Sequence, residues 1–207
     1  MCGVLKAPPM GMRVFLYLAG DSHPADQHVE QALRQRLAGQ GVLSLGERDI
    51  CDADRGLEKR KSAFVRMSDH FAGKQVIAIG RSSGGRIISL AASEGAPLTA
   101  MVALGYPFRA PGSDEDPART RHLALLQVPF LILQGEADYY GTRELATERY
   151  PLSPAVRIEA IEADHDLHLS QEQWDMIAAR IVRHADEQRW TARLRRTISG
   201  LARRVSR

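Results

Sequence analysis

The stretch Q-V-I-A-I-G-R-S-S-G-G-R-I-I-S-L-A-A, residues 75–92, decides how this chain folds. It joins an apolar run of strand length, residues 75–79, to a glycine-rich turn and then to a segment with helical spacing, residues 84–92. The turn, residues 80–84, reads G-x-S-x-G with Ser82 at its centre. Such a turn needs small residues around the serine, because larger side chains would collide with neighbouring backbone. The stretch therefore predicts a serine whose hydroxyl is exposed on a tight turn between a buried strand and a helix.

Outward from this stretch, apolar runs of strand length alternate with amphipathic segments of helix length. The runs are rich in Val, Ile and Leu, which is typical of parallel strands that are covered on both faces. The predicted strands are residues 13–19, 41–45, 75–79, 100–104, 130–134 and 156–161. The predicted helices are residues 26–38, 57–71, 84–92, 119–126, 143–150 and 171–187. This order predicts an α/β fold with a doubly wound, mostly parallel six-stranded sheet.

Length and composition narrow the class of protein. The chain has 207 residues, of which 44% are hydrophobic and 26% charged, as in an ordinary globular domain. No stretch is long and apolar enough to predict a transmembrane helix. The apolar run at residues 14–19 is followed by Gly20 and Asp21 instead of a cleavage site, which argues against a secretory signal. The two cysteines, Cys2 and Cys51, predict no structural disulfide, and we expect a cytoplasmic location.

Positive charge is concentrated at the C-terminus. Seven arginines and no acid follow residue 188, so residues 1–188 carry −4 although the whole chain carries +3. We therefore divide the chain into a domain, residues 1–187, and a basic tail, residues 188–207, and expect no nucleic-acid binding by the core. Apolar residues recur in the tail at helical spacing, which predicts an amphipathic helix. Such a helix is expected to pack on the body, on a second subunit or on an anionic membrane surface.

Polar residues follow two later predicted strands and could activate Ser82. A serine hydroxyl needs an adjacent base, usually a histidine that a carboxylate orients. Asp138 follows the run at residues 130–134, and His165 follows the run at residues 156–161. The carboxyl ends of parallel strands meet at one edge of a sheet, where ligands bind. The sequence therefore predicts Ser82 as nucleophile, His165 as base and Asp138 as the acid that orients it.

Each of these assignments has an alternative. The glycine-rich turn could bind a phosphate or simply reverse the chain. Glu136 competes with Asp138 for the role of the acid, and Asp138 could instead cap a helix, although Thr142 is placed to take that role. His168 is the competing base. The Asp and His residues at positions 164–168 lack the ligand spacing of known metal sites, so we predict no metal and no other cofactor.

The oxyanion of an attacked ester requires backbone donors close to the serine. Ser83 directly precedes the predicted helix at residues 84–92, so its amide can donate there. The second donor is expected from the loop after the first predicted strand, where Gly20 and Asp21 are both candidates. We assign the oxyanion hole to Ser83 and Gly20.

The substrate pocket is expected to be open, because the segment at residues 105–118 is too short for a large lid. Its aromatic residues and the positions around the serine supply the candidates for the pocket wall. The predicted substrate-binding residues are Arg81, Tyr106, Phe108 and Tyr139, with Tyr140 as a further wall candidate. Arg81 and Arg109 would attract a substrate carboxylate, or would pair with the acidic residues at 114–116.

Five short blocks carry a resemblance to a known family. They read G-R-S-S-G-G-R (80–86), L-G-Y-P-F (104–108), R-T-R-H-L (119–123), Q-G-E-A-D (134–138) and D-H-D-L (164–167). In this order they resemble the small α/β-hydrolase family that includes bacterial dienelactone-hydrolase-like proteins, testis-expressed 30 and NSL-complex subunit 3. The resemblance covers roughly residues 12–185. It implies a Ser82–Asp138–His165 triad on an α/β-hydrolase core, to which the short segment at residues 105–118 adds the expectation of minimal or no lid.

These observations give two main hypotheses of function. The first is a carboxylesterase-like serine hydrolase that acts on small or polar acyl esters and needs no cofactor. The second is a catalytically silent, hydrolase-like interaction or scaffold module, because some members of the resembling family serve as subunits of complexes. A third and weaker hypothesis is a protein that binds acyl or phosphate esters through the amides of the turn alone.

Overall fold

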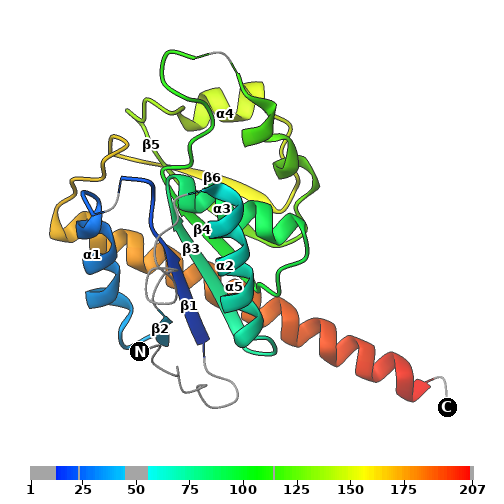
Figure 1. The fold of residues 1–207 in the computed structure, drawn as a ribbon. Helices are drawn as coiled ribbons and strands as arrows, with labels where there is room; N and C mark the ends of the chain where they lie inside the picture. Colours follow the sequence, from blue (N-terminus) through cyan, green and yellow to red (C-terminus); the bar gives the residue numbers. More distant parts are fainter. Residues whose placement is uncertain (1–12, 23, 45–55, 114, 206–207) are drawn as a thin grey trace.

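The computed structural model describes residues 13–22, 24–44, 56–113 and 115–205. Within them, six parallel strands form a sheet in the order β2-β1-β3-β4-β5-β6 (Figure 1). The strands are β1 (Arg13–Leu18), β2 (Val42–Ser44), β3 (Gln75–Arg81), β4 (Ala100–Leu104), β5 (Phe130–Gly135) and β6 (Val156–Ile161). The sheet confirms the predicted fold class, and each strand begins and ends within two residues of its predicted boundaries. Leu45, the predicted end of the second strand, lies outside the described residues.

Helices cover both faces of this sheet. They are α1 (Gln27–Leu37), α2 (Leu57–His70), α3 (Ser83–Ser93), α4 (Arg143–Arg149) and α5 (Gln171–Val205), with short 3-10 helices η2 (Pro117–Arg119) and η3 (Arg121–Leu125). In β1, Phe15 and Tyr17 pack with α1 and α5, whereas Leu16 and Leu18 pack with α2 and α3. The strand is therefore apolar throughout because it is buried on both faces.

Two expected elements differ from the structure. The helix expected at residues 119–126 is replaced by η2 and η3, because Thr120, with a φ of −130°, leaves the helical conformation between them. The last helix, α5, was expected to end at residue 187 but runs without a break to Val205. Its C-terminal part extends past the sheet (Figure 1). None of the described helices is both long and apolar enough to cross a membrane.

The strand order brings the loop after β1 next to the turn after β3. The chain passes from β1 outward to β2 and returns to pair β3 with the other side of β1, where Leu18 is in register with Gly80. Ligands bind beyond the carboxyl ends of the strands at such a change of direction. Residues 105–116, which follow β4, contain no helix or strand among their described positions, as expected for a minimal lid.

Candidate active site

The turn after β3 holds Ser82 in a strained conformation. Its φ of 48° and ψ of −119° are unusual for a residue with a side chain. The flanking glycines allow this turn, because a Cβ at Gly80 would overlap the backbone of Gly84 and Gly85. A Cβ at Gly84 would likewise overlap the carbonyl oxygen of Leu18 in the neighbouring strand. Strain of this kind persists only where the surrounding structure fixes the backbone, and it is common at functional sites.

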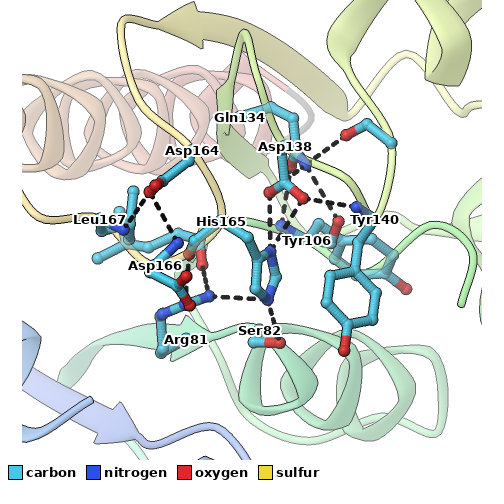
Figure 2. Close-up of polar contacts among 12 residues, drawn as sticks. Arg81, Ser82, Tyr106, Gln134, Asp138, Tyr140, Asp164, His165, Asp166 and Leu167 are labelled. Atoms are coloured by element: carbon cyan, nitrogen blue, oxygen red, sulfur yellow. Dashed lines mark hydrogen bonds and ion pairs between the residues drawn. The ribbon is translucent and has the colours of Figure 1, made fainter. Parts of the chain in front are cut away.

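Ser82, His165 and Asp138 form a chain of hydrogen bonds (Figure 2). The Ser82 Oγ lies 3.0 Å from the His165 Nε2. The His165 Nδ1 lies 2.9 Å from one carboxylate oxygen of Asp138 and 3.0 Å from the other. Because a carboxylate accepts, Nδ1 carries the proton and Nε2 is left to accept from the serine hydroxyl. This arrangement is the one that makes a serine hydroxyl nucleophilic.

Asp138 is fully buried, and neutral donors hold its carboxylate in place. The amide of Tyr140 donates to Oδ1 over 2.8 Å, and the Gln134 side chain donates to Oδ2 over 2.9 Å. Gln134 also donates to the carbonyl of Gly141, and its own oxygen accepts from the amide of Tyr106. Glu136, the competing acid, is exposed. The sequence did not single out Gln134, although a polar residue in an otherwise apolar strand is a signal that could have found it.

The turn that carries His165 is fixed on both sides. The Asp164 carboxylate accepts from the amides of Asp166 and Leu167 over 2.9 and 3.1 Å. Leu167 has a φ of 58° and is fully buried, so the turn is anchored in the core. On the other side, the Arg81 guanidinium donates to the His165 carbonyl and lies 3.3 Å from Nε2 (Figure 2). The imidazole therefore has a fixed position between Ser82 and Asp138.

The alternative roles of the residues near position 165 find no support in their positions. His168 is exposed and stacks on His28, with 5.0 Å between ring centroids. Asp164 is occupied by the backbone amides of its own turn. Across the described part of the chain, no group of three or more His, Cys, Asp or Glu side chains is arranged to hold a metal ion. Thr142 caps α4 by accepting from the amide of Leu145, so Asp138 is not needed as a cap.

The structure corrects three of the four predicted substrate-binding residues. Tyr106 and Phe108 are fully buried in the core, and the Tyr106 hydroxyl donates to the carbonyl of Arg119. Arg81 is 2% exposed, and its guanidinium donates to the carbonyl of His165. Tyr139 is 48% exposed with its ring 5.2 Å from the imidazole, so its role in substrate binding stays a prediction. The first three residues support the site from within instead of facing a ligand.

A hollow of about 280 Å³ opens beside Ser82. Its lining comes from the loop after β1, the first turns of α2 and α3, the end of η2, and the segments that follow β4 and β5. The lining residues are Asp21, Ser22, Leu57, Arg60, Ser82, Ser83, Arg86, Ile87, Pro107, Arg119 and Tyr140. Most of these residues are polar.

Of the two predicted oxyanion donors, Ser83 lines this hollow, and Gly20 directly precedes the lining residue Asp21. Ser83 is the first residue of α3, so its amide has no acceptor within the helix. Gly20 is pressed against the turn: a Cβ there would lie 3.3 Å from the Ser82 Cβ and 3.0 Å from the Asp26 carboxylate. A side chain at position 20 would therefore push the loop after β1 slightly away from the serine.

Arg60 fixes this loop, and sequence reasoning missed it. The side chain is only 6% exposed and reaches from α2 to the carbonyl of Ala19 and the carboxylate of Asp21, both at 2.6 Å. It also lies 3.3 Å from the Ser83 hydroxyl. Arg60 lies on the same helical face as the buried Ala63, Phe64 and Met67, and an arginine in line with such residues is a signal that could have found it.

Comparison with known proteins agrees with this fold. Residues 39–190 match a family model described as an alpha/beta hydrolase domain. Among curated proteins, none is detectably similar in sequence. Among solved structures, Est1E from Butyrivibrio proteoclasticus superposes with a TM-score of 0.63 at 16% identity, covering 87% of this chain and 89% of that one.

Two further solved structures share the fold. The Pyrococcus furiosus esterase Pf2001 has a TM-score of 0.66 at 16% identity, with 86% of this chain and 83% of that one covered. A monoacylglycerol lipase of Paleococcus ferrophilus has a TM-score of 0.60 at 14% identity, with 84% and 97% covered. At these identities the likeness concerns the fold alone.

Proposed function

The chain belongs to the alpha/beta hydrolase domain family, and from this premise we propose that it is a carboxylesterase-like serine hydrolase acting on small or polar acyl esters. The observation that carries the proposal is the hydrogen-bonded chain from Ser82 through His165 to Asp138, with the serine on a strained turn. The esterase and lipase folds among the similar structures agree with it. The five sequence blocks support a finer placement, beside dienelactone-hydrolase-like proteins.

The geometry supports a two-step acyl transfer. The Ser82 Oγ attacks the carbonyl carbon of the ester while His165 Nε2 takes the hydroxyl proton. Asp138 remains ionised and stabilises the imidazolium that forms. The amides of Ser83 and Gly20 donate to the oxyanion. The imidazolium then returns its proton to the leaving alkoxide, and a water molecule, deprotonated by the same nitrogen, hydrolyses the acyl-enzyme.

The surroundings of Ser82 favour a small substrate. A hollow of about 280 Å³ is below the 300–1,000 Å³ that is typical of sites for drug-sized ligands. The segment after β4 adds no helix or strand over the site among its described positions, and the lining of the hollow is mostly polar. Short acyl groups fit these dimensions better than long lipid chains.

A second candidate function is a silent interaction module. It is favoured by the end of α5, which extends past the sheet in Figure 1 and belongs to the segment with seven arginines. In that case the partner would be an acidic surface, a second subunit or an anionic membrane. The two candidates differ in whether Ser82 reacts.

Labelling with a fluorophosphonate probe tests the proposal. We expect the wild type to label, and Ser82→Ala and His165→Ala to lose labelling, because each removes a member of the nucleophile–base pair. Ser89→Ala is the matched control, since Ser89 is a buried serine that also contacts a histidine. It should label like the wild type. A folded wild-type protein that does not react with the probe would contradict the hydrolase proposal and favour the interaction module.

A further inference from the structure

The hollow beside Ser82 is rich in arginine. We propose that it is an anion-binding subsite for the acyl part of the substrate, so that the preferred substrates are monoesters of short dicarboxylic acids. The inference rests on the proposed function for turnover, but binding at the subsite can be measured without turnover.

The charges of the hollow do not cancel. Among the described residues that line it, three are arginines, Arg60, Arg86 and Arg119, and one carries a carboxylate, Asp21. Asp21 is paired with Arg60 at 2.6 Å, and Arg119 lies 3.7 Å from the exposed Asp116. Asp26 is buried near Gly20 without lining the hollow. The lining therefore presents excess positive charge, which is centred on Arg86.

Arg86 is the residue best placed to hold an anion. No described residue forms an ion pair with it, and the hydrogen bond seen for its guanidinium runs from Nη2 to the carbonyl of Ala118 over 3.2 Å. Its Nε is buried without a hydrogen-bond partner among the described residues. A buried donor left unsatisfied is costly, and a guanidinium binds a carboxylate through two parallel hydrogen bonds. The free donors of Arg86 therefore suit a carboxylate of the ligand.

The position of Arg86 sets the length of the acyl group. It follows Ser82 by four residues, about one turn of α3, or ~5.4 Å along the helix axis. Ser82 is the N-cap and lies outside the helix, but Ser82 and Arg86 both line the hollow, so the nucleophile and the guanidinium face the same space. A chain of about four carbons, as in a succinyl group, spans such a separation between the attacked carbonyl and a terminal carboxylate.

The lining indicates that the acyl part, and not the leaving alcohol, occupies the hollow. The leaving oxygen must receive its proton from His165 Nε2, so the alcohol lies beside that ring. His165 does not line the hollow. The hollow is lined instead by Ser83, on the turn after β3, and by Asp21, in the loop after β1. An ester placed with its oxyanion at these amides and its alcohol at His165 directs its acyl chain toward Arg86.

Matched esters test this preference. Monoethyl succinate and ethyl butyrate differ in the group at the end of a four-carbon acyl chain, a carboxylate or a methyl, and both release acid that a pH-stat measures. We expect a higher kcat/KM for the succinate in the wild type. Arg86→Gln should lower the succinate-to-butyrate ratio of kcat/KM about ten- to hundredfold, because a charge-assisted hydrogen bond is lost. Arg86→Lys should restore part of the ratio, since it keeps the charge but not the paired donors.

Arg183→Gln is the control for a lost positive charge, because Arg183 is exposed on α5, which covers the opposite face of the sheet. It should keep the wild-type ratio. An equal kcat/KM for the two esters in the wild type, or an equal effect of Arg86→Gln on both, would overturn the subsite while leaving the hydrolase proposal intact.

Calorimetric binding of monoethyl succinate to Ser82→Ala separates the two proposals. The variant cannot turn the ester over, so binding is read directly. We expect Ser82→Ala to bind the ester. The affinity should be lower by about tenfold or more in Ser82→Ala/Arg86→Gln and unchanged in Ser82→Ala/Arg183→Gln. Absence of binding, or binding independent of Arg86, would overturn the subsite. Arg86-dependent binding in a protein whose wild type reacts with no fluorophosphonate would retain the subsite and reject the hydrolase.

Discussion

The molecule contains two serine–histidine pairs of almost the same geometry. Ser82 Oγ lies 3.0 Å from His165 Nε2, and Ser89 Oγ lies 2.8 Å from His122 Nε2. Behind His165, Nδ1 meets the Asp138 carboxylate at 2.9 Å. Behind His122, Nδ1 is buried with no partner among the described residues. Contact between a serine and a histidine therefore does not make a nucleophile; the group behind the ring decides its role.

The two pairs differ in which partner donates. Ser89 donates its hydroxyl proton to the carbonyl of Arg86, one turn earlier in α3, over 2.9 Å. Its oxygen is then left to accept from His122 Nε2–H, so the other ring nitrogen carries no proton. Ser82, in contrast, sits outside the helix at a φ of 48° and donates to an accepting Nε2. One histidine is arranged as a base for its serine and the other as a donor to it.

Burial reinforces the difference. Burial, with the nearby charges of Arg86 and Arg121, lowers the pKa of His122 to about 4. The ring is thus neutral at physiological pH, and no carboxylate in the described part of the chain contacts its Nδ1 to stabilise a positive charge. Its role is structural. Its Nε2 also faces the hydroxyl of Tyr106, and that hydroxyl donates to the carbonyl of Arg119 beside the hollow.

Asp138→Asn would make the first pair resemble the second, and we expect the largest effect from it. An amide in place of the carboxylate can donate to Nδ1, which favours the tautomer with its proton on Nε2. We expect kcat/KM for short esters to fall about 10³- to 10⁴-fold, as for a triad whose acid loses its charge. Glu136→Gln, an exposed change in the same loop, is the matched control and should leave the rate unchanged. A loss below about tenfold in Asp138→Asn would show that the carboxylate does not orient His165.

Gln134→Met tests the next layer behind the base. Gln134 is a positioning residue, because its amide holds the Asp138 carboxylate and ties it to Gly141. We expect kcat to fall about ten- to hundredfold with little change in KM, since a misplaced carboxylate affects the transition state more than substrate binding. The rate is measured well below the melting temperature of the variant. A lower melting temperature with an unchanged kcat would assign Gln134 a purely structural role.

The sequence could predict the positions that depend on local pattern. The G-x-S-x-G turn is local, and its glycines are explained by backbone clashes within the turn and with β1. The placement of Asp138 and His165 after β5 and β6 follows from strand order, because parallel strands present their carboxyl ends at one edge. The structure brings these two residues and Ser82 together as that reasoning requires.

The sequence could not predict contacts that depend on tertiary packing. Tyr106 follows a strand just as a pocket residue would, but its hydroxyl finds the carbonyl of Arg119 in a later segment. Arg81 is charged and adjacent to the serine, yet the turn after β6 folds over it. Arg60 pairs with Asp21 in the loop after β1, although the two residues are 39 positions apart in the sequence. Spacing can mark such a residue as buried, as for Arg60, but it does not identify the partner, which comes from another segment of the chain.

His122→Gln tests the second pair. Of the three substitutions, we expect it to have the smallest effect, which is on stability and not on the rate. The pKa of His122 is about 4 in the folded protein, whereas in the unfolded chain it is near 6.5. The unfolded state therefore binds more protons between these values, and the wild type loses stability as the pH falls from about 6.5 toward 4. Between pH 7 and 5 we expect this one residue to cost about 1–2 kcal/mol of unfolding free energy, measured by urea denaturation at each pH.

The glutamine variant lacks this titration, so its stability should fall less than that of the wild type over the same pH range. His184, whose pKa burial also lowers, titrates in both proteins and cancels in the comparison. Equal losses in the two proteins would show that His122 is protonated in the fold. Ester hydrolysis at pH 7 should stay within about twofold of wild type in His122→Gln, since no carboxylate stands behind that ring and its serine already donates elsewhere. A large loss of activity would mean that the Ser89–His122 pair acts on the site through Tyr106, and the separation between the two pairs would then fail.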